Sequence, residues 1–170
     1  MNLQIDPVTT AADLDAVRAL CWAYRTTLMN NHPIDHDLTQ TFYPEPKYQA
    51  LMDDLADIHA RPTGIILLAK GPDMTPLGCG MSHALYPDTS EIKRVFVTEA
   101  ARGKGVAAGI CKALEDQARR DGFKRLVLDT SANLPAAKYL YDKLGFTRRD
   151  AYQPVPEEAL PHLLFFEKTL

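Results

Sequence analysis

The chain has few cysteines, one tryptophan and no long apolar run. Cys21, Cys79 and Cys111 are odd in number and widely spaced, which argues against a disulfide framework or a zinc cluster. No apolar stretch approaches the roughly 20 residues needed to cross a bilayer. The N-terminus, Met-Asn-Leu-Gln-Ile-Asp, lacks the basic and apolar regions of an export signal. We therefore expect a cytoplasmic protein with reduced thiols, no bound metal and no membrane partner.

A strong excess of charge of one sign is also missing. The sequence has 19 Lys and Arg against 22 Asp and Glu, for a net charge of −3. This balance indicates no general affinity for nucleic acid. A hydrophobic content of 46% and a charged content of 24% are ordinary for a globular protein. The length of 170 residues suits a single domain, 1–170, with a substantial core.

The most informative segment covers residues 91–107. Apolar residues Val95, Phe96 and Val97 indicate a strand, and a polar turn with Gly103 and Gly105 follows it. An amphipathic helix begins directly after this turn. Unpaired N–H groups at a helix start, together with the helix dipole, bind anions. The segment therefore predicts a site for a phosphorylated ligand.

Two common phosphate-binding patterns fit this turn poorly. A Walker-type loop requires Gly-Lys-Ser/Thr, but Lys104 lies between the two glycines and no hydroxyl residue follows Gly105. A dinucleotide fingerprint is formally matched by Gly103, Gly105 and Ala108, with Asp129 downstream. That fingerprint normally follows a buried, continuously apolar strand, whereas this strand carries three charged residues. A nicotinamide-dependent oxidoreductase is therefore the weaker interpretation.

A third pattern, Arg/Gln-x-x-Gly-x-Gly/Ala, is matched by Arg102, Gly105 and Ala107. A second segment lies downstream: Asn133-Leu-Pro-Ala-Ala-Lys-Tyr-Leu-Tyr141-Asp-Lys-Leu-Gly-Phe. Together, over roughly residues 89–146, the two segments resemble the acyl-CoA loop and the closing segment of the GCN5-related N-acetyltransferase (GNAT) superfamily. The resemblance implies an acetyl-CoA-dependent N-acetyltransferase.

The hydrophobic pattern predicts elements in the order β-αα-βββ-α-β-α-ββ. Helices are expected near 10–28, 48–58, 103–121 and 133–144, and strands near 3–6, 65–69, 77–85, 90–98, 123–129, 146–148 and 163–168. Residues 30–46 are expected to form an irregular binding loop. This is the order of the GNAT-like acyl-CoA N-acyltransferase fold, an α/β class with a twisted mixed sheet and helices on both faces.

The resemblance also implies the residues that bind the co-substrate. The strand before the glycine turn would part from its parallel neighbour, so Val95 and Val97 could offer backbone groups to the pantetheine arm, with Phe96 between them. Asn133 would either cap the following helix or hydrogen-bond the amides of this arm. The pyrophosphate would bind the amides of Arg102, Gly103, Lys104, Gly105, Val106 and Ala107.

Tyr141 and Glu91 are the candidate catalytic residues. Tyr141 lies in the family register Leu-Tyr-x-Lys-x-Gly-Phe and could protonate the departing thiolate as general acid. A core tyrosine is the competing interpretation. Glu91, which shares strand parity with Val95 and Val97, could take a proton from the amine as general base. A solvated Glu–Lys pair at a strand end is its competing interpretation.

The predicted reaction is direct transfer of the acetyl group, in a ternary complex, to a primary amine of a small molecule or peptide. The acceptor stays open, because Lys93 and Arg94 favour a carboxylate-bearing amine whereas the acidic segment 35–54 favours a polyamine or a protein lysine. The alternative function is an acyl-CoA-binding sensor or regulatory module without turnover. The apolar terminal strand, residues 163–166, could pair across a homodimer.

Overall fold

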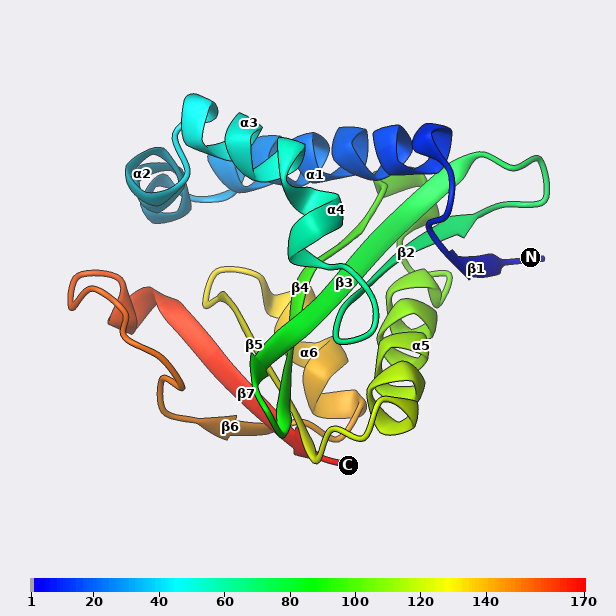
Figure 1. Cartoon of the computed structure of the whole chain (residues 1–170). Helices are drawn as coiled ribbons and strands as arrows, with labels where there is room; N and C mark the ends of the chain where they lie inside the picture. Colours follow the sequence, from blue (N-terminus) through cyan, green and yellow to red (C-terminus); the bar gives the residue numbers. More distant parts are fainter. Residues whose placement is uncertain (1) are drawn as a thin grey trace.

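The computed structural model describes residues 2–170, whose seven strands form one sheet with helices on both faces (Figure 1). The strands are β1 Gln4–Pro7, β2 Ile65–Lys70, β3 Pro76–Tyr86, β4 Thr89–Val97, β5 Arg125–Ser131, β6 Thr147–Arg149 and β7 Leu163–Thr169. The α-helices are α1 Ala11–Asn31, α2 Pro33–Phe42, α3 Glu45–Asp53, α4 Leu55–Ile58, α5 Val106–Arg120 and α6 Pro135–Lys143. Short 3₁₀ turns lie at Glu99–Ala101 and Leu160–His162. In residues 2–170, no helix combines the length and apolar character needed to cross a bilayer.

The sheet has the order β1-β2-β3-β4-β5-β7-β6 and mixes the two pairing directions. Strands β1 to β4 pair antiparallel, β4 and β5 pair parallel, and β5, β7 and β6 pair antiparallel. The parallel pair is short: its register begins at Thr89↔Arg125 and ends at Glu91↔Val127. Beyond these residues β4 and β5 separate. The predicted mixed α/β sheet, including the parting of these two strands, is confirmed.

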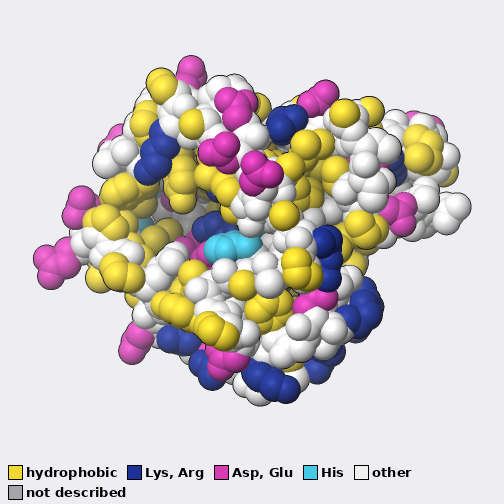
Figure 2. Space-filling view, viewed as in Figure 1, with side chains coloured by type: hydrophobic (Ala, Val, Ile, Leu, Met, Phe, Trp, Pro, Cys, Tyr) yellow, Lys and Arg dark blue, Asp and Glu magenta, His cyan; other side chains and the backbone are white. Residues whose placement is uncertain are grey.

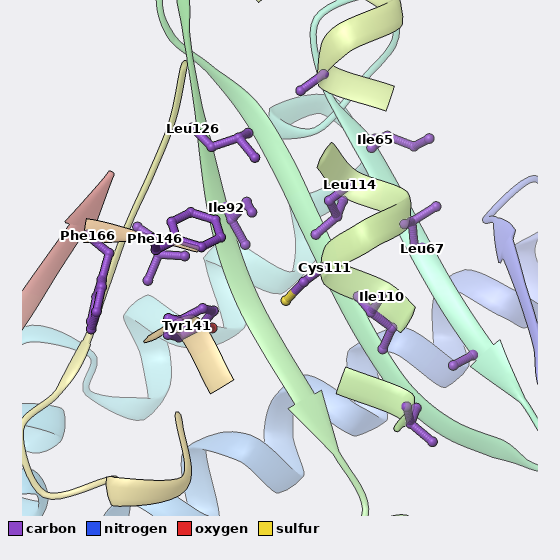
Figure 3. Packing of buried hydrophobic residues seen from close by; sticks show 14 of the residues in the cluster. Ile65, Leu67, Ile92, Ile110, Cys111, Leu114, Leu126, Tyr141, Phe146 and Phe166 are labelled. Atoms are coloured by element: carbon purple, nitrogen blue, oxygen red, sulfur yellow. The ribbon is translucent and has the colours of Figure 1, made fainter. Parts of the chain in front are cut away.

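Each face of the sheet has its own hydrophobic core. Strand β2 shows the alternation, since Ile65 and Leu67 join the core under α5 and α6, whereas Ile66 and Leu68 join the core under α1 and α3. Figure 3 shows the first core in the neighbourhood of α5. The helices therefore hold the sheet from both sides and fix the ends of β4 and β5, where the two strands part.

The expected loop at residues 30–46 is wrong, because most of it is helix α2. His32 caps this helix through its side chain, whose Nδ1 accepts a hydrogen bond from the N–H of Ile34 at 3.2 Å. Pro33 occupies the first turn, where its missing N–H costs nothing and its fixed φ suits the helix. The second predicted helix is also divided, into α3 and α4 at Asp54.

A β-bulge interrupts β4 at Arg94. The register with β3 shifts here, and Arg94 has a φ of 51°, in the left-handed region that non-glycine residues rarely adopt. Val95 and Val97 therefore pack into the same core as Ile92. The prediction that Glu91 shares a face of β4 with the two valines is wrong. The extra residue at the bulge puts Val95 and Val97 on the face of the sheet opposite to Glu91.

Strand β7 lies inside the sheet and is not a free edge. Phe165 and Phe166 each have a partner in β5 and another in β6. At these two residues, β7 therefore has no open edge that could pair with the same strand of a second copy. The homodimer stays a prediction that needs another surface.

Candidate functional site

The predicted anion site lies between β4 and α5. Gly103 and Gly105 have φ values of 72° and 79°, and a Cβ placed on either would meet no atom within 4 Å. The left-handed backbone explains why glycine occupies both positions, since residues with a Cβ rarely adopt it. The space beside both glycines is open. Gly105 caps α5 without a side-chain hydrogen bond, and the first backbone bond of the helix runs from Gly109 to its carbonyl. The amides of Val106 and Ala107 therefore remain available to an anion.

A cavity of about 380 Å³ opens where β4 and β5 separate. Residues 92–94 of β4 and 129–131 of β5 line its inner wall, just beyond the last paired residues, Glu91 and Val127. Helices α1 to α3 line one side of the cavity, and residues from 153–163 line the other. Figure 2 shows this face hollowed below the N-terminal helices, with cationic, acidic and histidine side chains near the hollow.

Glu91 is buried, with 3% of its surface exposed, and its carboxylate is held on several sides. Nε2 of His83 donates to Oε1 at 2.8 Å, and the hydroxyl of Tyr152 donates to Oε2 at 2.5 Å. Nζ of Lys93 lies 3.8 Å from Oε2. Burial alone would raise the pKa of Glu91, but the hydrogen bond from His83 and the charge of Lys93 outweigh it and lower the pKa. A solvated pair at a strand end is thus the wrong description of Glu91.

Asp129 is the acidic residue that faces the cavity from β5. Burial raises its pKa, against the opposing charge of Lys93. Burial would lower the pKa of Lys93, but the charges of Asp129 and Glu91 raise it overall. The sequence analysis connected Asp129 only with a dinucleotide fingerprint. Its position after the apolar run of β5 was the available signal, because ligands bind beyond the carboxyl ends of strands in α/β sheets.

Tyr141 lies on α6, packed between Phe146 and Phe166 at ring-centroid distances of 5.7 and 5.5 Å (Figure 3). Burial raises the pKa of Tyr141 well above its usual value, and Cys111 adds to the effect. The side chain is therefore a neutral phenol in an apolar setting. Tyr139, which falls outside the family register, is 65% exposed.

Asn133 does not cap α6, so that alternative is wrong. The N-cap residue is Leu134, without a side-chain hydrogen bond. Nδ2 of Asn133 instead donates to Oδ1 of Asp35 at 3.4 Å, and the carbonyl of Asn133 accepts from Asn31 at 2.9 Å. The residue thus connects the end of β5 to α1 and α2. Hydrogen bonding to the pantetheine arm stays a prediction.

The three apolar residues of β4 point to different faces. Val95 and Val97 pack into the core under α5, whereas Phe96 packs under α1 and stacks on Tyr24 at 5.7 Å. Within residues 2–170, β4 has no partner in β5 after Glu91. Its backbone there has no strand partner on the β5 side, as the predicted pantetheine contact requires, although the carbonyl of Val97 accepts a hydrogen bond from Nε of Arg102 at 3.4 Å.

A sequence model of the Acetyltransferase (GNAT) family matches residues 34–146, about two-thirds of the chain. The chain belongs to this family. The matched region holds the glycine turn, the parting strands and Tyr141, so the resemblance found in two motifs is confirmed.

Relatives and solved structures agree with this membership. An uncharacterized N-acetyltransferase of Schizosaccharomyces pombe is 29% identical over 161 residues, which cover 91% of this chain and 90% of that protein. The IAA acetyltransferase of Azospirillum brasilense is 34% identical over 129 residues, covering 72% and 80%. The PaiA N-acetyltransferase of Thermoplasma acidophilum, solved with coenzyme A, superposes with a TM-score of 0.72 at 14% identity over 100% of both chains. This last likeness shows the shared fold.

Proposed function

We propose that this GNAT family member transfers an acetyl group from acetyl-CoA directly to a primary amine of a small molecule or peptide. The observation that carries the proposal is the position of the cavity. It opens into the gap between β4 and β5, so an acyl group placed along the free edge of β4 would meet an acceptor held in the cavity.

The family membership implies acetyl-CoA, and the residues around the glycine turn suit it. The amides of residues 102–107 would bind the pyrophosphate, because the start of α5 is uncapped and the two glycines leave open space. Arg102 and Lys104 are exposed beside the turn and would add positive charge. The backbone of Val95 and Val97, which has no partner in β5, would pair with the pantetheine amides, and Asn133 could donate to the same arm.

Tyr141 is the proposed general acid. When the amine nitrogen bonds to the acyl carbon, the carbon–sulfur bond breaks and a thiolate must gain a proton. A phenol, which is protonated at neutral pH, can donate a hydrogen bond or the proton to this sulfur. Its packing against two phenylalanines would hold the ring in place, so the roles of core residue and acid are compatible.

A carboxylate near Lys93 is the proposed general base. Glu91, the candidate from the sequence, already accepts hydrogen bonds on both oxygens. Asp129 lines the cavity, and its raised pKa makes it the better proton acceptor. We propose Asp129 as the group that takes the proton of the amine. Glu91, whose Oε2 lies 3.8 Å from Nζ of Lys93, is the second candidate.

Buried thiols support direct transfer over a route through an acyl-cysteine. All three cysteines are buried. Burial raises the pKa of Cys111 to about 12, so this thiol stays protonated at neutral pH, whereas the hydrogen bond with Cys79 lowers the pKa of Cys21. A protonated thiol is a poor nucleophile.

The test combines calorimetric titration of the protein with acetyl-CoA and an assay of thiol release with a panel of primary amines. We expect heat of binding and amine-dependent release of coenzyme A. Binding without release for any amine would favour the sensor function. Absence of binding would reject both.

A further inference from the structure

Two guanidinium groups line the cavity without a carboxylate partner in residues 2–170. They belong to Arg25, on α1, and to Arg94, at the bulge of β4. An arginine at a buried position normally has such a partner, since an unpaired charge is costly to remove from water. The two residues come from different walls of the same cavity, Arg25 from the side formed by α1 to α3 and Arg94 from the inner wall.

Arg25 is only 7% exposed and is incompletely hydrogen-bonded. Its Nε donates to the carbonyl of Tyr43 at 3.0 Å, but its Nη2 is buried without a partner. The rings of Trp22 and Tyr48 flank the guanidinium at 5.9 and 6.0 Å. The aromatic rings hold the charge in place but offer no acceptor oxygen. An anionic ligand would supply the missing acceptor.

Arg94 is held in a costly backbone conformation. Its φ of 51° is left-handed, a conformation that is unfavourable for a residue with a side chain. Bulges next to active sites commonly re-aim one side chain, and here the re-aimed residue lines the cavity. Strain of this kind at a cavity wall indicates a functional requirement for the side chain.

The two acidic residues of the cavity, Asp35 and Asp129, have different surroundings. Asp35 accepts from the hydroxyl of Ser131 at 2.5 Å and from Nδ2 of Asn31 at 2.7 Å. Asp129 lies near Lys93 and, with a weaker influence, Arg94, whose charges both act to lower its pKa against the larger effect of burial. The cavity thus has a mixed pole at Asp129 and Lys93, and a cationic pole at Arg25 and Arg94.

We infer that Arg25 and Arg94 form a carboxylate-binding subsite, so the acetyl acceptor is a primary amine that carries a carboxylate, as a free amino acid does. This inference rests on the proposed function. Two poles of different character can orient such a molecule, with its carboxylate on the arginines and its amine toward Asp129. The volume of about 380 Å³ suits a single small ligand.

The test compares amines that differ only in this group. Thiol release is measured with the common L-amino acids, with their α-amides, and with dipeptides, which separate the carboxylate from the amine. We expect kcat/KM for at least one free amino acid to exceed that of its amide by more than tenfold, with dipeptides used poorly. Equal use of acids and amides would overturn the subsite and leave acetyl transfer intact.

Single variants then assign the effect. R25M and R94M should raise the KM of the preferred amino acid about 10- to 100-fold, since each removes charged hydrogen bonds. They should leave the affinity for acetyl-CoA unchanged and should lower kcat/KM for the amide much less than kcat/KM for the free acid. R120M, at the exposed end of α5, is the matched control and should behave as the parent protein. Unchanged KM in both cavity variants would also overturn the subsite.

A binding measurement covers the case in which no amine is turned over. Saturation-transfer NMR with coenzyme A present would compare N-acetyl amino acids with their amides. Binding of the acids alone, lost in R25M and R94M, would support the subsite even if acetyl transfer is disproved. Equal signals from acids and amides, or no signal from either, would reject it.

Discussion

At the residue scale, the surroundings of Tyr141 raise the pKa of its hydroxyl, so the phenol stays protonated. The ring packs between two phenylalanines, and burial keeps the phenol neutral. Removing only the oxygen should therefore leave the packing intact.

We predict that Tyr141→Phe lowers kcat by about 10²–10⁴, the range expected for loss of a general acid. The affinity for acetyl-CoA and the melting temperature should change little, because the aromatic contacts remain. Steady-state kinetics, calorimetry and thermal unfolding would check this. Turnover equal to that of the parent protein would remove the acid role and leave Tyr141 as a core residue.

Glu91 and Asp129 differ in their surroundings, and that difference can be tested. We predict that Asp129→Asn lowers kcat/KM at pH 7 about 100-fold. Activity should recover in part as the pH approaches the pKa of the acceptor amine, because the amine then loses its proton without a base. Glu91→Gln should cause a smaller loss, because its carboxylate already has two hydrogen-bond donors. Rate–pH profiles of both variants decide between them. A larger, pH-relieved loss in Glu91→Gln would return the base role to that residue.

At the element scale, helix α5 begins and ends with a glycine in the left-handed region. Gly105 and Gly122 have φ values of 79° and 87°, and a Cβ on either would meet nothing within 4 Å. The two positions are equivalent in backbone strain, but only Gly105 lies at the proposed phosphate site.

We predict that Gly105→Ala and Gly122→Ala each lower the free energy of unfolding by roughly 1–2 kcal/mol, the cost of a left-handed alanine. Only Gly105→Ala should also raise the Kd of acetyl-CoA, because its methyl group and altered turn would disturb the amides of α5. Denaturant unfolding and calorimetry on the pair measure the two effects separately. Equal Kd values would place the phosphate elsewhere.

The elements best predicted from sequence are those with strong local signals. The strand, turn and helix around Gly103 and Gly105 follow from residue pattern and backbone chemistry, and the family motifs placed them correctly. Helix α2 was missed because His32-Pro33-Ile-Asp-His36 at its start is a polar, proline-containing sequence typical of a loop, whereas a proline in a first turn favours a helix. The bulge at Arg94 was missed because no local pattern marks it.

The cavity was harder to predict, since it joins residues far apart in the chain. Arg25 and Asp129 belong to separate elements, and each has an ordinary sequence context. These two residues line one cavity with Arg94 and Lys93 only because α1 packs over the sheet at this place. Periodicity indicates which face of a helix is buried, but not which residue on another element it meets.

At the scale of the whole molecule, His59 couples the fold to pH. It is 2% exposed, its Nδ1 donates to the carbonyl of Ser82 at 2.9 Å, and its Nε2 is buried without a partner. Burial lowers the pKa of His59 to about 4, against a usual 6.5. Between these values the unfolded chain takes up a proton that the folded protein does not.

We predict that the free energy of unfolding falls as the pH decreases from 6.5 to about 4, and that His59 contributes on the order of 3 kcal/mol to this fall. Its contribution should level off below pH 4, where both states are protonated. His59→Gln keeps a donor for Ser82 but cannot titrate, so its stability should decline less steeply. Urea unfolding at several pH values checks this, and parallel curves for the two proteins would contradict it.

The two cores also separate the routes by which molecules reach the gap between β4 and β5. The glycine turn belongs to the side of the sheet covered by α5, whereas the cavity is walled by α1 to α3. On the proposed function, acetyl-CoA would enter from the side of the glycine turn and the acceptor amine through the cavity. Neither would block the other, so the acetylated product could depart while the spent coenzyme is still in place, and the order of arrival would be free.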